Sequence, residues 1–197
     1  MQIDVRTNVK QVQKSLTRIQ RKQIPYATSV AINETAKKLV AAEQRGMKAK
    51  LDRPRPQTIK ALRIFQYSKK TTLTSRIGFP EWANRYMSYQ VYGGTRPVTT
   101  VVPLNQYGGA LNAYGSIPAR KNKGWAKKRK QFFVESKGKT LLMRPKGRDD
   151  QIVVGVLTDN PVYKKRFPFY KIASGVVTRV FPKELNKSLK KALATAR

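Results

Sequence analysis

The sequence contains no cysteine and no histidine. Without cysteine the chain has no disulfide and no thiolate nucleophile, and without histidine it lacks the commonest acid-base group of enzymes. Ordinary zinc sites need the same two residue types. The chain also shows no pair of carboxyl groups spaced for acid-base work, so we expect a protein that is not an enzyme and holds no cofactor or metal.

Long hydrophobic runs are missing as well. No stretch approaches the roughly 18 apolar residues that a membrane-spanning helix needs. The first residues, Met1 to Val5, lack the basic and then apolar order of a signal peptide. These absences predict a protein that is made in a cytoplasm, stays soluble and has no membrane partner.

Acidic residues are scarce, and basic residues are abundant. The chain of 197 residues has 42 Lys and Arg against 10 Asp and Glu, a formal net charge of +32. Each successive quarter of the sequence carries its own excess of cations, so the charge is not confined to a tail. A body of this kind repels itself and associates rapidly, in a salt-sensitive way, with polyanions or acidic surfaces. The charge therefore predicts a polyanionic or acidic partner.

Hydrophobic spacing predicts an α+β fold in one domain over residues 1–197. We expect N-terminal amphipathic helices over 4–62, a β-rich part over 63–180 and a C-terminal helix over 182–196 that packs, like the first helices, on an antiparallel sheet. The predicted strands are 63–68, 73–79, 98–102, 131–136, 140–143 and 152–157, with a turn between Glu135 and Thr140.

Two helix starts in this prediction rest on proline. Val5, Val9 and Val12 recur at helical spacing and predict a first amphipathic helix. Pro25 and Pro182 suit the first turn of the second helix and of the last helix, because that position needs no backbone N–H donor.

A long central loop, residues 103–130, lies between the predicted strands. It exceeds the usual length of a loop in a compact domain, so we expect it to be mobile or ordered by a partner. Its second half is the densest cationic cluster of the chain and includes a tryptophan that could stack on a base. The predicted DNA- or partner-binding residues are Arg120, Lys121, Lys123, Trp125, Lys127, Lys128, Arg129 and Lys130. A solvated loop, or one docked on an acidic protein face, is the alternative.

One short motif suggests a different chemistry. Glu135 and Lys137, at the end of a predicted strand, have the spacing of half a metal-dependent nuclease site, in which a carboxylate holds Mg²⁺ and a lysine stabilises the attacking water or the phosphate. The nearest upstream aspartate, Asp52, lies in a proline-rich connector. An ordinary surface strand end therefore explains the motif better.

The order of these parts resembles the minor tail protein Z family of long-tailed bacteriophages, also called tail completion proteins and related to head-tail joining proteins. The resemblance rests on the first helix, Pro25 and the run from Ala31 to Asn33 followed by Ala36. Near the other end it rests on three stretches, Arg166-Phe-Pro168 with Lys171-Ile172, Pro182-Lys-Glu-Leu185, and Ala192-Leu193. These stretches cover about half the chain, and the segment from Tyr86 to Lys130 departs from the family pattern.

The resemblance implies an α+β structural protein of the virion, at the neck where tail and head are joined. It implies a ring of several copies that contacts the tail terminator, the tail tube and the head-side connector, with DNA passing through the channel under non-specific electrostatic attraction. The charge alone is equally compatible with a stand-alone nucleic-acid-binding protein, for instance one associated with the ribosome. A metal-dependent nuclease is the third alternative.

Overall fold

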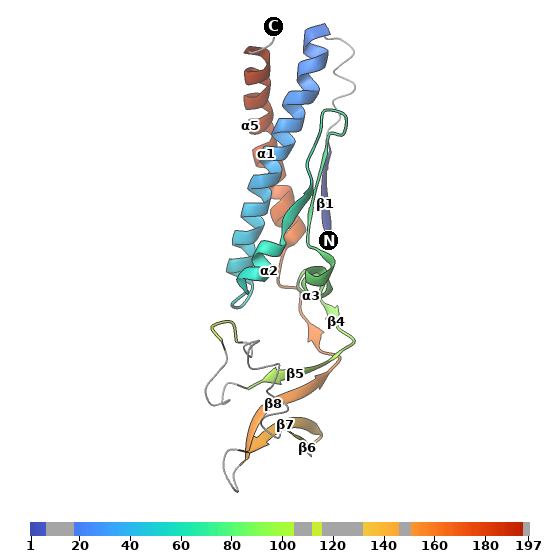
Figure 1. The fold of residues 1–197 in the computed structure, drawn as a ribbon, viewed down its shortest axis with the longest axis vertical. Helices are drawn as coiled ribbons and strands as arrows, with labels where there is room; N and C mark the ends of the chain where they lie inside the picture. Colours follow the sequence, from blue (N-terminus) through green and yellow to red (C-terminus); the bar gives the residue numbers. More distant parts are fainter. Residues whose placement is uncertain (7–17, 105–111, 116–131, 146–150, 195–197) are drawn as a thin grey trace. The chain divides into compact units, whose positions relative to one another are not determined.

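The fold is seen in a computed structural model that describes residues 1–6, 18–104, 112–115, 132–145 and 151–194 (Figure 1). It consists of helices and antiparallel sheets, so the expected α+β class is confirmed. The contacts of the chain, which is predicted to be a single domain, group into two compact units. Met1–Val91 and Arg166–Arg197 form one, called here the discontinuous unit, and Tyr92–Lys165 form the other, the inserted unit.

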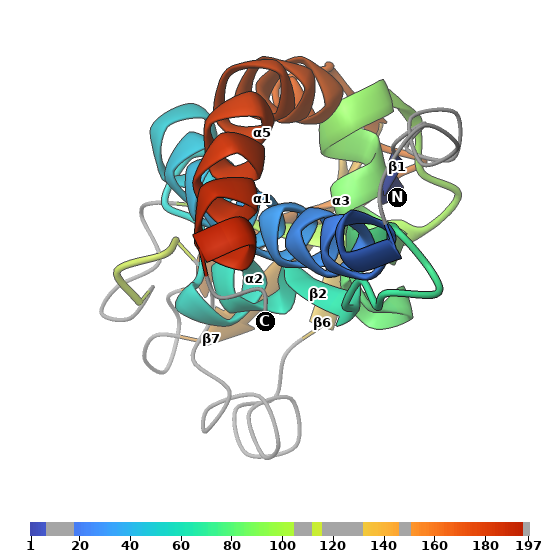
Figure 2. The same cartoon turned by 90° about the horizontal axis from the view of Figure 1, so that it is seen from above.

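The discontinuous unit combines two long helices with a small sheet. Helices α1 and α5 lie side by side and antiparallel (Figures 1 and 2). The sheet has three antiparallel strands in the order β1-β3-β2. The elements are β1 (Gln2–Arg6), α1 (Arg18–Lys50), α2 (Pro56–Ala61), β2 (Arg63–Gln66), β3 (Thr74–Gly78), α3 (Glu81–Tyr92) and α5 (Phe169–Ala194).

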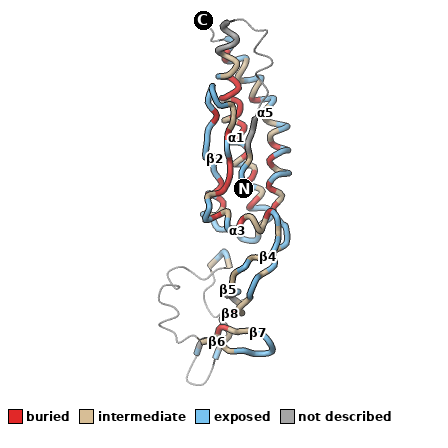
Figure 3. The backbone as a smooth tube through the Cα atoms, turned by 90° about the vertical axis from the view of Figure 1, so that its right-hand side faces the viewer, coloured by how far each residue is buried: buried red, intermediate tan, exposed pale blue. Residues whose placement is uncertain are grey.

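The hydrophobic core lies where α1 and α5 meet each other and the sheet (Figure 3). Small side chains of α1 allow α5 to approach closely. A Cβ atom on Gly46 would lie 2.7 Å from Cδ1 of Ile172. The fully buried side chains of this core include Ala31, Ala36, Leu39, Met47, Ile77, Phe167 and Phe169.

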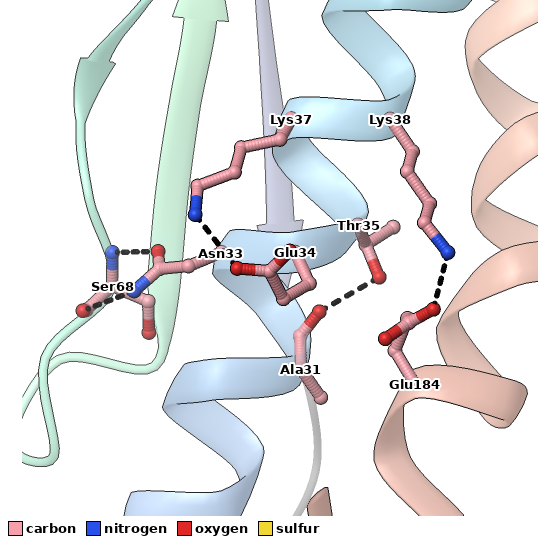
Figure 4. Close-up of polar contacts among 8 residues, drawn as sticks. All are labelled: Ala31, Asn33, Glu34, Thr35, Lys37, Lys38, Ser68 and Glu184. Carbon is pink, nitrogen blue, oxygen red and sulfur yellow. Dashed lines mark hydrogen bonds and ion pairs between the residues drawn. The ribbon is translucent and has the colours of Figure 1, made fainter. Parts of the chain in front are cut away.

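A polar clamp fixes the β2–β3 connection on α1 (Figure 4). The Asn33 side chain accepts a hydrogen bond from the Ser68 backbone N–H at 2.7 Å and donates one to the Ser68 carbonyl at 3.0 Å. Ser29 donates a further bond to that carbonyl at 2.9 Å. Because Ser29 and Ser68 are buried, these bonds replace ones that water would otherwise supply.

We expect Asn33→Asp to destabilise the fold by about 1 to 3 kcal/mol. The new carboxylate keeps the acceptor for the Ser68 N–H but turns an oxygen, instead of an N–H donor, towards the Ser68 carbonyl. Chemical denaturation measures the loss. The same substitution at exposed Asn186 is the control and should change the free energy of unfolding by less than about 0.5 kcal/mol. Equal effects at the two positions would show that the clamp is not stabilising.

The inserted unit is built of strands. β4 (Gly94–Thr95) pairs with β9 (Val162–Tyr163), and a separate antiparallel sheet has the order β5-β8-β7-β6. Its strands are β5 (Thr99–Pro103), β6 (Phe132–Ser136), β7 (Lys139–Pro145) and β8 (Gln151–Asp159). Lys137 and Gly138 join β6 to β7 with φ angles of 49° and 70°, as a two-residue hairpin turn with both central residues left-handed requires. The turn predicted between Glu135 and Thr140 is thus confirmed.

The strand predictions are confirmed in outline, since each of the six overlaps an observed strand. The first predicted helix is wrong at its start. Gln2–Arg6 is a strand, in which Ile3 pairs with Ile77 of β3. Ile3 and Val5 alternate as in a strand, and pairing with β3 decides between that pattern and the helical one. Positions 7–17 of this prediction lie outside the described residues.

Both proline-based helix starts are also wrong. Pro25 lies inside α1, and Pro182 lies inside α5. Each proline removes one backbone hydrogen bond, but the long packing of α1 against α5 stabilises helix on both sides of it. Helix α5 begins at Phe169, inside the range predicted to be β-rich. Helix α3 also lies inside that range, and it was not among the predicted elements.

Candidate nucleic-acid interface

Helix α5 carries a row of exposed cations, here called the α5 stripe. Its members are Arg179, Lys183, Lys187 and Lys190, spaced by four, four and three residues, and all four are exposed. Residues at these spacings share one helix face. In the second half of α5, buried Glu184 and Ala192 mark the face turned inwards. The stripe is therefore held on a rigid, packed helix.

The stripe has no counterion within the described residues, where none of its four cations forms an ion pair. Several carboxylates of the discontinuous unit already have a local cation. The shortest N–O distances are 2.7 Å for Lys37–Glu34, 2.5 Å for Lys38–Glu184, 3.2 Å for Arg53–Asp52 and 2.6 Å for Arg85–Glu81. Lys38–Glu184 joins α1 to α5 (Figure 4). Among the described residues, this local pairing leaves the stripe open to an external anion.

The length of the stripe suits a nucleic-acid backbone. Eleven residues separate its ends, which is about 16 Å along the helix at 1.5 Å per residue. One strand of B-DNA advances about 3.4 Å per phosphate, so the stripe spans roughly five phosphates. Lysine and arginine meet phosphates without reading bases, and such contacts bind any sequence. The stripe is thus suited to non-specific binding of duplex DNA.

A second electrostatic feature lies in the interior. Glu43 of α1 is fully buried, and within the described residues neither carboxylate oxygen has a hydrogen-bond partner. Burial raises its pKa to about 8, from an ordinary value of 4.5, because the charged form loses its hydration. The neutral form of Glu43 therefore predominates at neutral pH in the folded protein.

The residues predicted from sequence as the DNA- or partner-binding site lie outside the described residues. This applies to Arg120, Lys121, Lys123, Trp125, Lys127, Lys128, Arg129 and Lys130, and to most of the predicted loop over 103–130. Their role stays a prediction.

Glu135 and Lys137, the pair that resembles half a nuclease site, lie within the described residues. Glu135 is exposed on β6, opposite Thr140 of β7, and Lys137 is exposed in the turn that follows. In the described part of the chain no three acidic side chains gather where they could hold a metal ion. A surface strand end beside a tight turn accounts for both residues.

The α5 stripe was missed in the sequence, although its spacing of four, four and three was visible there. Because the last helix was predicted to start at Pro182, Arg179 lay outside it. No helix of the described residues is long and apolar enough to span a bilayer. Comparisons of the chain with models of protein families, with curated proteins and with solved structures gave no match.

Proposed function

We propose that this protein is a structural, non-enzymatic subunit of the virion of a tailed bacteriophage, a tail completion or neck component that helps to join tail to head around the DNA channel. The proposal is supported by the sequence resemblance to the minor tail protein Z family. The α+β fold is the class that this resemblance implies. The partners would be the tail terminator, the tail tube, the head-side connector, other copies of this chain in a ring, and DNA.

The α5 stripe is the observation that carries the proposal. A channel subunit needs fixed cations that attract DNA of any sequence without reading its bases. Arg179, Lys183, Lys187 and Lys190 meet that need, since they are exposed on one helix face and have no ion-pair partner among the described residues.

Assembly is supported by one face of the inserted unit. The strand register places Val102, Val156, Leu141 and Val134 in a row across all four strands of its larger sheet. None of the four is buried, and Val102 is 46% exposed. An apolar row of this kind gains free energy when another protein surface covers it. It would serve as a contact between subunits.

Particles made without the protein test the proposed function. We expect a phage with an interrupted reading frame for this chain to produce filled heads and separate tails in electron micrographs, and infectivity to fall by several orders of magnitude. Supplying the intact chain from a plasmid should restore joined particles. Complete, infectious particles in its absence would contradict the proposal.

A stand-alone nucleic-acid-binding protein is the second candidate, because the α5 stripe by itself needs no virion. Titrations with duplex DNA and structured RNA at several salt concentrations separate the two. A specialised binder keeps a preference for one structure or sequence at high salt, whereas a neck component binds both weakly and with steep salt dependence.

A further inference from the structure

An apolar groove of about 450 Å³ lies on the discontinuous unit, away from the residues of the α5 stripe. It is lined by α2, the first residue of β2 and the start of α3, and its members include Pro56, Lys60, Arg63, Pro80 and Trp82. We call it the Trp82 groove, since the Trp82 side chain is 47% exposed there. A second hollow of about 430 Å³, which includes Phe65, shares Pro80 with it.

The walls of the Trp82 groove are held in place before any partner binds. The Tyr86 hydroxyl and the Thr58 hydroxyl are hydrogen-bonded at 3.1 Å, which ties α3 to α2. The Trp82 ring lies 6.3 Å from the Tyr86 ring in a tilted arrangement. A preformed pocket binds with a smaller loss of conformational entropy than one that must form on binding.

The edge strand beside the groove is shaped against strand pairing. β2 is an outer strand of its sheet, and a bulge between Ile64 and Gln66 interrupts its ladder with β3. Such bulges block the addition of another strand and redirect side chains. Arg63 and Phe65 are both exposed here, whereas Ile64 is partly buried against the core.

The cations of the groove have no acidic partner among the described residues. The Arg63 guanidinium lies 5.1 Å from the centre of the Phe65 ring, a cation–π contact that orients it while leaving N–H donors for a ligand. Lys60 forms no ion pair within the described part of the chain. The nearby Glu81 is engaged by Arg85 at 2.6 Å, and this hydrogen bond lowers the pKa of Glu81. An incoming carboxylate would meet positive charge that no acid of the described residues already pairs with.

We propose that the Trp82 groove binds an acidic segment of another protein, with an apolar side chain beside Trp82 and an Asp or Glu carboxylate on Arg63 and Lys60. Exposed tryptophan and arginine around a pocket are the residue types that dominate protein–protein binding energy. The volume accommodates one large side chain and part of a second. This inference goes beyond the proposed function, because it concerns a different surface and holds whether or not the protein belongs to a virion.

The same features argue against nucleic acid as the occupant. A single strand needs a row of cations along its backbone as well as aromatic platforms. The groove offers Lys60 and Arg63 beside an apolar lining, and Arg63 covers one face of the Phe65 ring. Two cations at an apolar pocket match a carboxylate next to an apolar anchor.

Selection from a library of random 12-residue peptides on the full chain tests the proposal. We expect the selected peptides to carry Asp or Glu next to Leu, Phe or Trp, and to bind Trp82→Ala and Arg63→Glu at least tenfold more weakly than the wild type. Lys69→Glu makes the same charge change as Arg63→Glu at an exposed position elsewhere on this unit and should alter the affinity less than twofold. Arg63→Glu keeps the test valid if Trp82→Ala does not fold.

Fluorescence gives a second readout. The chain has two tryptophans, so Trp125→Phe leaves Trp82 as the single reporter, and its emission should shift when a selected peptide is added. The proposal is overturned if no peptide is selected, if the peptides lack acidic residues, if both groove variants bind as the wild type does, or if Trp82 emission does not respond. An oligothymidine that displaces the peptide from the wild type, and that binds the two groove variants more weakly, would assign the groove to nucleic acid. That result would equally overturn the proposal.

Discussion

Replacing Glu43 with methionine should make the protein more stable, increasingly so as the pH rises from about 5 to about 8. In the folded protein burial raises the pKa of Glu43 to about 8, whereas in the unfolded chain the carboxyl ionises near its ordinary 4.5. Below pH 4.5 the carboxyl of Glu43 is neutral in both states, and its burial costs the wild type no charge desolvation. As the pH rises from 4.5 to about 8, the free energy of unfolding of the wild type falls. At about 1.4 kcal/mol per pKa unit, the loss reaches roughly 3 to 5 kcal/mol.

Methionine is unbranched, of similar length and without a charge to desolvate, so Glu43→Met should not show this loss. Urea denaturation of both proteins at pH 5, 6.5 and 8.5 measures the difference. Glu34→Gln on the same helix is the matched control, because the Glu34 side chain is 41% exposed and pairs with Lys37. Parallel stability curves for the wild type and Glu43→Met across this range would show that Glu43 is not held neutral in the core.

Removing three cations of the α5 stripe should weaken binding to a 30-base-pair DNA duplex by roughly two to three orders of magnitude at about 0.1 M salt. Each phosphate contact contributes about 0.9 to the slope of log affinity against log salt. The variant Lys183→Gln, Lys187→Gln, Lys190→Gln should therefore have a slope shallower by about 2.7. The loss should be the same for unrelated DNA sequences, because phosphate contacts do not distinguish bases.

A charge-matched variant separates a defined site from the effect of total charge. Lys139, Lys164 and Lys165 are exposed in the inserted unit, and changing all three to glutamine removes the same three charges. We expect that variant to alter the salt slope by less than 1. Equal losses in the two triple variants would mean that DNA responds only to the overall charge of the protein, and the α5 stripe would then be no site.

The strands were predictable because their signals are local. Val98 to Val102 and Ile152 to Leu157 are dense in β-branched residues. The turn at Lys137 and Gly138 follows a run with two phenylalanines and a valine, which is also typical of a strand. The limits of the long helices were not predictable, because a proline indicates the start or the end of a helix until the packing of that helix is known. Helix α3 was hidden by its aromatic residues, which are as frequent in strands, although the acidic Glu81 after Pro80 marks its first turn.

Long-range polar contacts were beyond reach of the sequence. Lys38 and Glu184 are 146 positions apart, and nothing in either neighbourhood indicates that they pair across α1 and α5. The same holds for Asn33 with Ser68. The Trp82 groove combines residues of α2, β2 and α3 and requires their packing to be known. By contrast, the α5 stripe could have been predicted from the sequence once the first residue of α5 was placed correctly.

Because the inserted unit separates α1 from α5 in the sequence, the two helices are synthesised at different times. Helix α1 ends at Lys50 and its partner α5 begins at Phe169, so a ribosome moving at about 5 to 20 residues per second needs roughly 6 to 24 s between them. During that interval Leu39 and Met47 on the nascent chain have no α5 to cover them. The nascent protein is therefore exposed to aggregation until α5 has been translated, and a chaperone acting on the segment that contains α1 should raise its yield.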